Sequence, residues 1–224
     1  MPQLGFKLRF RFPFLVHVSV IFLLALTLFA DPNPAASDNR SISPDKKWTY
    51  QPDADPPEIR KTGSDEVGVS FSDECGGGGC DSATIVWAPD SRRFAYGYGH
   101  GRDHSTSLYQ LDGNEWRPLK SLRDSNEILE AVERVLATQG AKKGLKRDRL
   151  QLSEYYERVH NWIDSNTATV YVCDFERAEP EDQFFLVRLV FTLKFDQVGN
   201  WEIIRKRPMS DQEFDRFQKQ NFER

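Results

Sequence analysis

Three side chains that can bind a metal or transfer a proton lie close together in one glycine-rich stretch, GYGHGRDHST. Three residues separate His100 from His104, and Asp103 is the last of them. Imidazole and carboxylate groups are zinc ligands, and they also act as general acids and bases. This spacing is compatible with a metal site that activates water for hydrolysis. A polar turn between two strands has the same composition, so that interpretation stays open.

A second candidate is the segment DECGGGGCD, in which four glycines separate Cys75 from Cys80. Two thiols at this spacing suit a disulfide in an oxidising compartment, because glycines relieve side-chain strain in so short a ring. Zinc held by both cysteines with His100 and His104 is an alternative, although the gap between Cys80 and His100 is longer than in zinc fingers. The sequence favours the disulfide. Cys173, in TVYVCDFE, has the context of a buried strand residue.

Acidic side chains gather at Asp53 and Asp55, and again at Asp73, Glu74 and Asp81. Carboxylate oxygens there could hold calcium, but neither group has the spacing of a twelve-residue calcium-binding loop. Solvated acidic loops have the same pattern. We therefore expect no resident cofactor, with zinc or calcium as the alternatives.

Residues 1–30 have the pattern of an export signal. They contain no Asp or Glu, and Lys7, Arg9 and Arg11 precede an apolar run over 12–30 that ends in a small residue. A basic segment followed by such a run is typical of a cleavable signal peptide. The run also approaches the roughly 20 residues that span a bilayer, so an N-terminal anchor is the alternative. Either way, we expect the remaining chain to be periplasmic or extracellular.

The charge balance argues against nucleic acid as a partner. The chain has 30 basic and 34 acidic residues, and loss of the three basic residues in 1–30 leaves 27 against 34. An acidic surface repels phosphate backbones and is only weakly attracted to anionic lipid. The expected partners are therefore an envelope protein or a glycan, with the membrane contacted only through an N-terminal anchor.

The chain beyond the leader divides into a short linker and one domain. Residues 31–41 are rich in Pro, Asp and Ser and predict a flexible tether, whereas 42–224 can form one buried core. Alternating apolar and polar residues, separated by turn residues, predict antiparallel sheets over 42–120 and 155–207. The stretch 145–160 fits either a helix or a strand, and we prefer a strand where it enters the second sheet.

Two helices are predicted from apolar spacing and capping residues. Apolar residues recur at helical spacing over 125–138, and Gly140 is expected to end that helix. Ser210 and Glu213 form a capping-box pattern at the start of a short C-terminal helix over 210–222. The first helix is amphipathic and should pack its apolar stripe on the sheets.

One motif occurs twice. SPDKKWTY begins at Ser43 and APDSRRFAY begins at Ala88, and both combine Pro-Asp, a basic pair, an aromatic residue and Tyr. The longer segment VWAPDSRRFAYGYG resembles the Pro-Asp blade motif of TolB-type and WD-type β-propellers. The resemblance implies that Pro89 and Asp90 form the turn between two inner strands of a blade. It also implies that the flanking aromatic residues lie in the core.

The resemblance covers about a third of the chain, and SLYQLDGNEWRPL is similar to the outer hairpin of the same blade. A closed propeller typically needs at least four blades, and this chain has room for two sheets. The expectation is therefore a blade-like sheet without a closed ring. The arrangement is also similar to small exported bacterial proteins that lack an assigned activity.

Together these patterns predict an α+β fold, with two antiparallel β-meanders joined by an amphipathic helix and followed by a short C-terminal helix. We expect a non-catalytic binding or interaction module of the cell envelope, with loops 75–81 and 97–105 as its contact surface. The alternative is a metal-assisted hydrolase that uses His100, Asp103 and His104.

Overall fold

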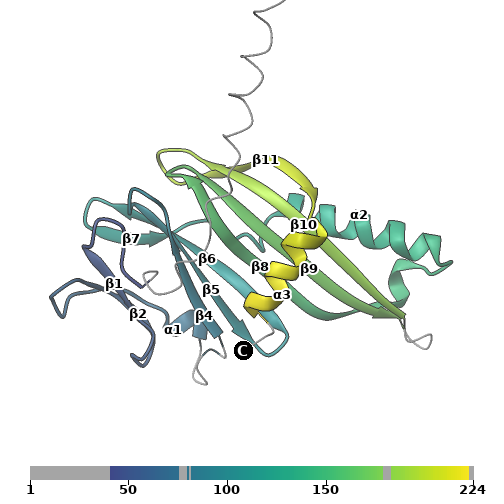
Figure 1. The fold of residues 1–224 in the computed structure, drawn as a ribbon, viewed down its shortest axis with the longest axis horizontal. Coiled ribbons are helices and arrows are strands. Elements are labelled where there is room, and N and C mark those ends of the chain that lie inside the picture. The colour runs from purple at the N-terminus through teal and green to yellow at the C-terminus, as the bar shows by residue number, and fades with distance from the viewer. Residues whose placement is uncertain (1–40, 76–79, 81, 179–182, 222–224) are drawn as a thin grey trace, which may run out of the picture. The chain divides into compact units, whose positions relative to one another are not determined.

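The computed structural model describes residues 41–75, 80, 82–178 and 183–221 (Figure 1). All of them belong to one compact unit that spans 38–224. They form a mostly β structure with three α-helices, and the main sheet curls into half a barrel without closing. The structure thus agrees with an α+β class. The expected leader and nearly all of the expected tether lie outside the described residues.

A small antiparallel sheet begins the described chain. It consists of β1 (Trp48–Gln51), β2 (Glu58–Lys61) and β3 (Val67–Ser70), in that order. Its inner face packs against the next strands through an aromatic cluster, because large rings fill the space between two facing sheets. The rings of this cluster include Trp48, Tyr50, Phe71, Phe94, Tyr96, Tyr109 and Trp116. The region expected to form one sheet over 42–120 is therefore two sheets.

A short helix, α1 (Ser72–Cys75), leads into an antiparallel meander within the larger sheet. The meander strands are β4 (Ser82–Trp87), β5 (Arg93–His100), β6 (Asp103–Asp112) and β7 (Glu115–Pro118). Pro89 and Asp90 lie in the turn between β4 and β5. Asp90 Oδ1 there accepts the backbone N–H of Arg92 at 3.1 Å, and Ser91 has a φ of 60°. Trp87 packs on Phe94 across this turn, with ring centroids 5.0 Å apart.

The stretch expected as a loop over 97–105 is instead a tight hairpin. β5 continues to His100 and β6 already begins at Asp103, so only Gly101 and Arg102 turn the chain. Gly101 has a φ of 57°, a conformation that glycine adopts without steric cost. The candidate residues around this turn therefore lie in strands and alternate between two faces.

Helix α2 (Asn126–Lys142) runs further than predicted. Gly140 was expected to end it but is buried within its last turn, where an added Cβ would lie 3.2 Å from the carbonyl oxygen of Leu145. The chain that follows the helix comes close at Leu145, and this close approach explains why position 140 is a glycine. Gly144, with a φ of 71°, lies just beyond the end of the helix instead.

The second half begins with a 3-10 turn (Arg147–Arg149) and forms a second antiparallel meander. Its elements are β8 (Leu150–Asp164), β9 (Thr167–Ala178), β10 (Gln183–Phe195), β11 (Trp201–Pro208) and α3 (Asp211–Asn221). The ambiguous stretch 145–160 is thus mainly strand. Ser210 Oγ accepts the N–H of Glu213 and a Glu213 carboxylate oxygen accepts the N–H of Ser210, which is the expected capping box.

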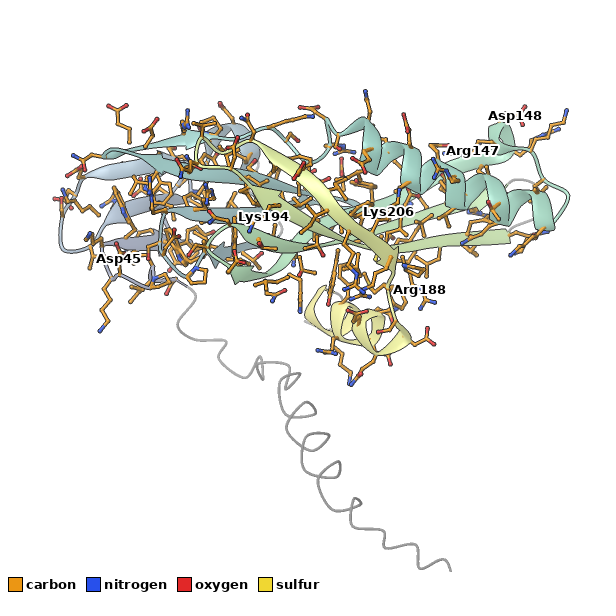
Figure 2. The ribbon with its side chains drawn as sticks, turned by 90° about the horizontal axis from the view of Figure 1, so that it is seen from above. Asp45, Arg147, Asp148, Arg188, Lys194 and Lys206 are labelled. Atoms are coloured by element: carbon orange, nitrogen blue, oxygen red, sulfur yellow. The ribbon has the colours of Figure 1, made fainter. Side chains whose placement is uncertain are left out.

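The two meanders are not separate sheets. β6 pairs in parallel with β8 through Asp103–Tyr155 and His104–Tyr156, and this junction makes one sheet of eight strands. Helices α2 and α3 cover opposite sides of that sheet, and Figure 2 shows Arg147 beside α2 and Arg188 toward α3. The largest apolar cluster lies on the α2 side. Within the described part of the chain, no helix combines the length and apolar character needed to cross a membrane.

Two buried charged side chains also connect the meanders. Arg93 on β5 reaches the β8–β9 and β10–β11 turns, with bonds to backbone carbonyls of Ser165 and Asp196; we call this the Arg93 tie. Glu157 on β8 reaches β6, where its Oε1 accepts the N–H of Thr106 at 3.3 Å; we call this the Glu157 tie. The hydroxyl of Thr106 donates in turn to the carbonyl of Glu157 at 2.9 Å.

Candidate functional site

The structure separates two of the three predicted metal ligands. Asp103 and His104 are consecutive residues of β6, so their side chains point to opposite faces. Asp103 is half-exposed and pairs with Arg123, whose Nη1 lies 2.7 Å from Oδ2. The side chain of His100 lies outside the described residues. Within the described part of the chain, no group of three His, Cys, Asp or Glu side chains could hold a metal ion.

His104 lies in a narrow slot between Tyr156 of β8 and Gly99 of β5. It is only 8% exposed, and its ring stacks on Tyr156 with centroids 4.2 Å apart and planes 14° from parallel. The opposite strand must carry glycine here, because a Cβ on Gly99 would lie 2.1 Å from Nδ1 of His104. Burial and then the charge of Arg158 lower the pKa of His104 below its ordinary 6.5. The imidazole is therefore neutral at pH 7.

Beside this slot, strand β8 lies over β4 and β5. Arg158 passes close to Gly97, where an added Cβ would lie 3.4 Å from Nε, and the indole N–H of Trp162 donates to the carbonyl of Val86 at 3.0 Å. Gly97 would also bring its Cβ to 3.0 Å from Oγ1 of Thr84. Gly97 therefore leaves room for the side chains of Thr84 and Arg158.

Several polar groups gather around the two glycines. In the register of β4 and β5, Ser82 is opposite Gly99 and Thr84 is opposite Gly97. On the other side of β5, Gly99 pairs with His104 of β6. We call the set the β5–β8 seam, and its members are Ser82, Thr84, Gly97, Gly99, His104 and Arg158. Hydroxyl, imidazole and guanidinium groups thus meet at one place on the sheet.

Three buried atoms of the seam have no hydrogen-bond partner among the described residues. They are Oγ of Ser82, Oγ1 of Thr84 and Nδ1 of His104. The His104 ring is held through a hydrogen bond to the backbone of Gly101, which leaves Nδ1 unused. Buried polar groups are satisfied in the great majority of cases, since leaving one unpaired costs about 1–3 kcal/mol. Three such atoms at one crossing are therefore informative.

The polar groups of the seam have mixed hydrogen-bonding character, and the three unpaired atoms are buried. Each hydroxyl can donate or accept, and the guanidinium of Arg158 donates. His104, whose ring nitrogen Nδ1 is unprotonated when the other nitrogen donates, accepts. Sugar hydroxyls and peptide groups have this mixed character. Strong base catalysis is not favoured here, because burial and a neighbouring cation both disfavour protonation of His104.

A second group of buried polar residues lies on the other face of β8 and β9. Glu157 is fully buried and accepts the hydroxyl of Tyr155 at 3.2 Å. Asp174 is opposite Tyr155 in the strand register and is 6% exposed, and its Oδ1 has no partner among the described residues. The nearby Arg147 pairs with Glu176 at 2.8 Å rather than with Asp174.

Both buried acids hold their protons at unusually high pH. Burial raises the pKa of Glu157 to about 7 against the opposing effect of hydrogen bonds from Thr106 and Tyr155. Burial and then the negative charge of Glu176 raise the pKa of Asp174 to about 7. Such shifts are common at functional sites and at buried structural contacts alike. Because Glu157 lies where the β6–β8 ladder ends, we interpret it as a structural contact.

Sequence reasoning included Gly97, Gly99 and His104 in the expected contact loop 97–105, but it missed Ser82, Thr84, Arg158 and both buried acids. A signal existed for the acids: Glu157 lies between Tyr155 and Val159 at strand spacing, and Asp174 follows Val170 and Val172 on the same face. An acidic residue that replaces an apolar one on a buried strand face indicates a buried charge.

The cysteine segment is only partly described. Cys80 packs against the aromatic cluster of the small sheet, whereas the side chain of Cys75 and residues 76–79 and 81 lie outside the described residues. Cys173 is free and fully buried, as its strand context predicts. The pairing of Cys75 with Cys80 therefore stays a prediction.

Comparisons with protein-family models, with curated proteins and with solved structures return no match to this chain.

Proposed function

We propose that the protein is exported to the cell envelope and acts there as a non-catalytic binding module, with the β5–β8 seam as its contact site. The proposed ligand is a hydrogen-bonding group of an envelope protein or of a glycan. The N-terminal apolar run supports export as a signal or anchor. An oxidising compartment would in turn favour a disulfide between Cys75 and Cys80.

One observation carries the proposal: three buried polar atoms, of Ser82, Thr84 and His104, lie close together on the sheet and have no hydrogen-bond partner among the described residues. A fold without a ligand at this place would gain stability from apolar residues there, because the hydroxyls contribute only a desolvation cost. Gly97 leaves room for the side chains of Thr84 and Arg158, and Gly99 leaves room for the ring of His104. A ligand that completes the hydrogen bonds would account for the unpaired atoms.

The substitution Thr84→Val tests this proposal, because it replaces one hydroxyl by a methyl group of the same shape. Immobilised protein, with residues 1–30 removed, is exposed to extracts of envelope proteins and glycans from its own host. We expect a ligand that wild-type protein retains and that Thr84→Val binds at least tenfold more weakly. Thr49→Val, on β1 and outside the seam, is the control and should retain the ligand.

The opposite result is equally clear. If Thr84→Val retains the same ligands as wild type and unfolds at higher urea concentration, the hydroxyl of Thr84 only destabilises the fold. In that case the seam has no binding role, and the proposal fails.

The alternative is a metal-assisted hydrolase that uses His100, Asp103 and His104. Its support is the spacing of these residues, but Asp103 pairs with Arg123 and points away from His104. Metal analysis of purified protein separates the two functions. Stoichiometric zinc that is lost in His100→Ala would favour the hydrolase, whereas zinc-free protein that still binds its ligand favours the binding module.

A further inference from the structure

At the opposite end of β5 from the seam, Arg93 carries a buried positive charge without a matching carboxylate. Its side chain is 4% exposed. Nε donates to Gln110 Oε1 at 2.8 Å, Nη1 donates to the carbonyl of Ser165 and to Asn166 Oδ1, and Nη2 donates to the carbonyl of Asp196. All four acceptors are neutral, so none of these bonds compensates the charge.

The nearest carboxylates have other partners. Asp196 accepts the backbone N–H groups of Val198 and Asn200. Asp90 uses one oxygen for the N–H of Arg92. Both acids favour the charged form of Arg93 from a distance, but burial still lowers its pKa below the ordinary value. A guanidinium that remains charged in this setting gains strongly from an anion in contact with it.

A cleft of about 530 Å³ opens directly onto Arg93. Its lining residues are Asp90, Arg92, Arg93, Asn166, Gln197 and Val198. Two arginines against one aspartate give the lining a net charge of +1, and the amides of Asn166 and Gln197 can donate further hydrogen bonds. The lining is therefore suited to a small anion with several acceptor oxygens.

We propose that this cleft binds a carboxylate group, held by Arg93 at its base and by Arg92 at its rim. Among the described residues, four of the five N–H groups of Arg93 have partners, which leaves one on Nη2 for a ligand. Charge-assisted bonds from guanidinium to carboxylate are short and about twice as strong as neutral ones. The site is independent of the β5–β8 seam, since the two lie at opposite ends of β5.

Two sources could present the carboxylate: an acidic sugar or the C-terminus of a peptide. Glucuronate represents the first and N-acetylalanine the second, and glucose is the neutral control for glucuronate. Binding is followed by backbone and side-chain NMR shifts of the full domain. We expect glucuronate, N-acetylalanine or both to shift the resonances of Arg92, Asn166 and Val198, and we expect no shift from glucose.

Arg92→Gln should weaken carboxylate binding about tenfold, because it removes one charge at an exposed position without touching the Arg93 tie. Arg134→Gln, on the exposed side of α2, removes the same charge elsewhere and should bind as wild type does. Thr84→Val should also bind the carboxylate normally, which separates this site from the seam. The proposal is overturned if neither carboxylate shifts these resonances, or if Arg92→Gln and Arg134→Gln weaken binding equally.

Discussion

The Arg93 tie and the Glu157 tie connect the same two meanders, but they hold their charge in opposite ways. Arg93 meets four acceptors from four different residues and remains a cation. Glu157 meets two donors, the N–H of Thr106 and the hydroxyl of Tyr155, and its pKa is raised to about 7. One buried group is thus fully ionised at neutral pH, and the other is close to half-protonated.

The difference follows from what each side chain can do when water is removed. A guanidinium cannot lose its proton in a protein, so a buried arginine needs hydrogen-bond acceptors from the surrounding chain. A carboxyl group can become neutral instead, so it tolerates burial with fewer partners. The stability that the Arg93 tie contributes should therefore not depend on pH. The stability that the Glu157 tie contributes should depend on it.

Arg93→Met should have the largest effect on stability. It removes the cation and leaves four acceptors, among them Gln110 and Asn166, without their donor. Each buried acceptor that loses its donor typically costs about 1–3 kcal/mol, so we expect a loss of several kcal/mol. Urea denaturation followed by tryptophan fluorescence measures it. Arg92→Met, one residue earlier and exposed, should change stability by less than about 0.5 kcal/mol; equal losses for the two variants would mean that the tie contributes nothing.

Stability should fall as pH rises from about 4 to about 7. In this window the unfolded chain ionises Glu157 and Asp174, whose ordinary pKa values are 4.5 and 3.8, while the folded protein keeps both protons until about pH 7. Because the folded state then binds more protons, the free energy of unfolding decreases with pH, by up to about 3 kcal/mol for each acid.

The variants Glu157→Gln and Asp174→Asn isolate this effect from the other titrating groups. Each should flatten the stability profile between pH 4 and 7 relative to wild type, because neutral amides do not titrate. Thermal unfolding at a series of pH values gives the comparison. Profiles of the same slope in wild type and both variants would show that these carboxyls titrate normally.

Gly99→Ala should cost about 1–3 kcal/mol, because its Cβ would lie 2.1 Å from Nδ1 of His104 and the ring must move. Gly97→Ala should cost less, since its nearest neighbour is Oγ1 of Thr84 at 3.0 Å. The double variant Gly99→Ala/His104→Ala checks the mechanism by denaturation, and it should recover most of the loss. If the double variant is as unstable as the sum of the single ones, the ring contact is not the cause.

Local features of this fold could be predicted from sequence. Pro89 and Asp90 lie in a turn because proline fixes one backbone angle and aspartate caps the following N–H groups. The Ser210–Glu213 capping box also depends on neighbouring residues alone. Gly140 misled the prediction, because its role comes from the contact with Leu145 rather than from the helix end.

Contacts between distant segments could not be predicted. The parallel pairing of β6 with β8 joins residues about fifty positions apart, and no turn between them specifies it. The separation of Asp103 from His104 has a related cause, because both residues were expected to lie in the loop 97–105. Because β6 begins at Asp103, the alternation of a strand places the two side chains on opposite faces.

The smallest effect should come from the ion pair of Arg207 with Glu213, which attaches α3 and is the partly exposed counterpart of the two ties. The guanidinium Nη2 lies 2.6 Å from Oε1 and lowers the pKa of Glu213 to about 2. Solvent screens this pair, so Glu213→Gln should cost at most about 1 kcal/mol.

The loss of stability in Glu213→Gln should become smaller as salt is added, because salt screens exposed charges. The loss in Arg93→Met should not change, because salt hardly screens buried charges. Denaturation at low and high ionic strength measures both. A salt dependence of equal size in the two variants would mean that Arg93 is solvated like Arg207, and the distinction between buried and exposed attachment would then be wrong.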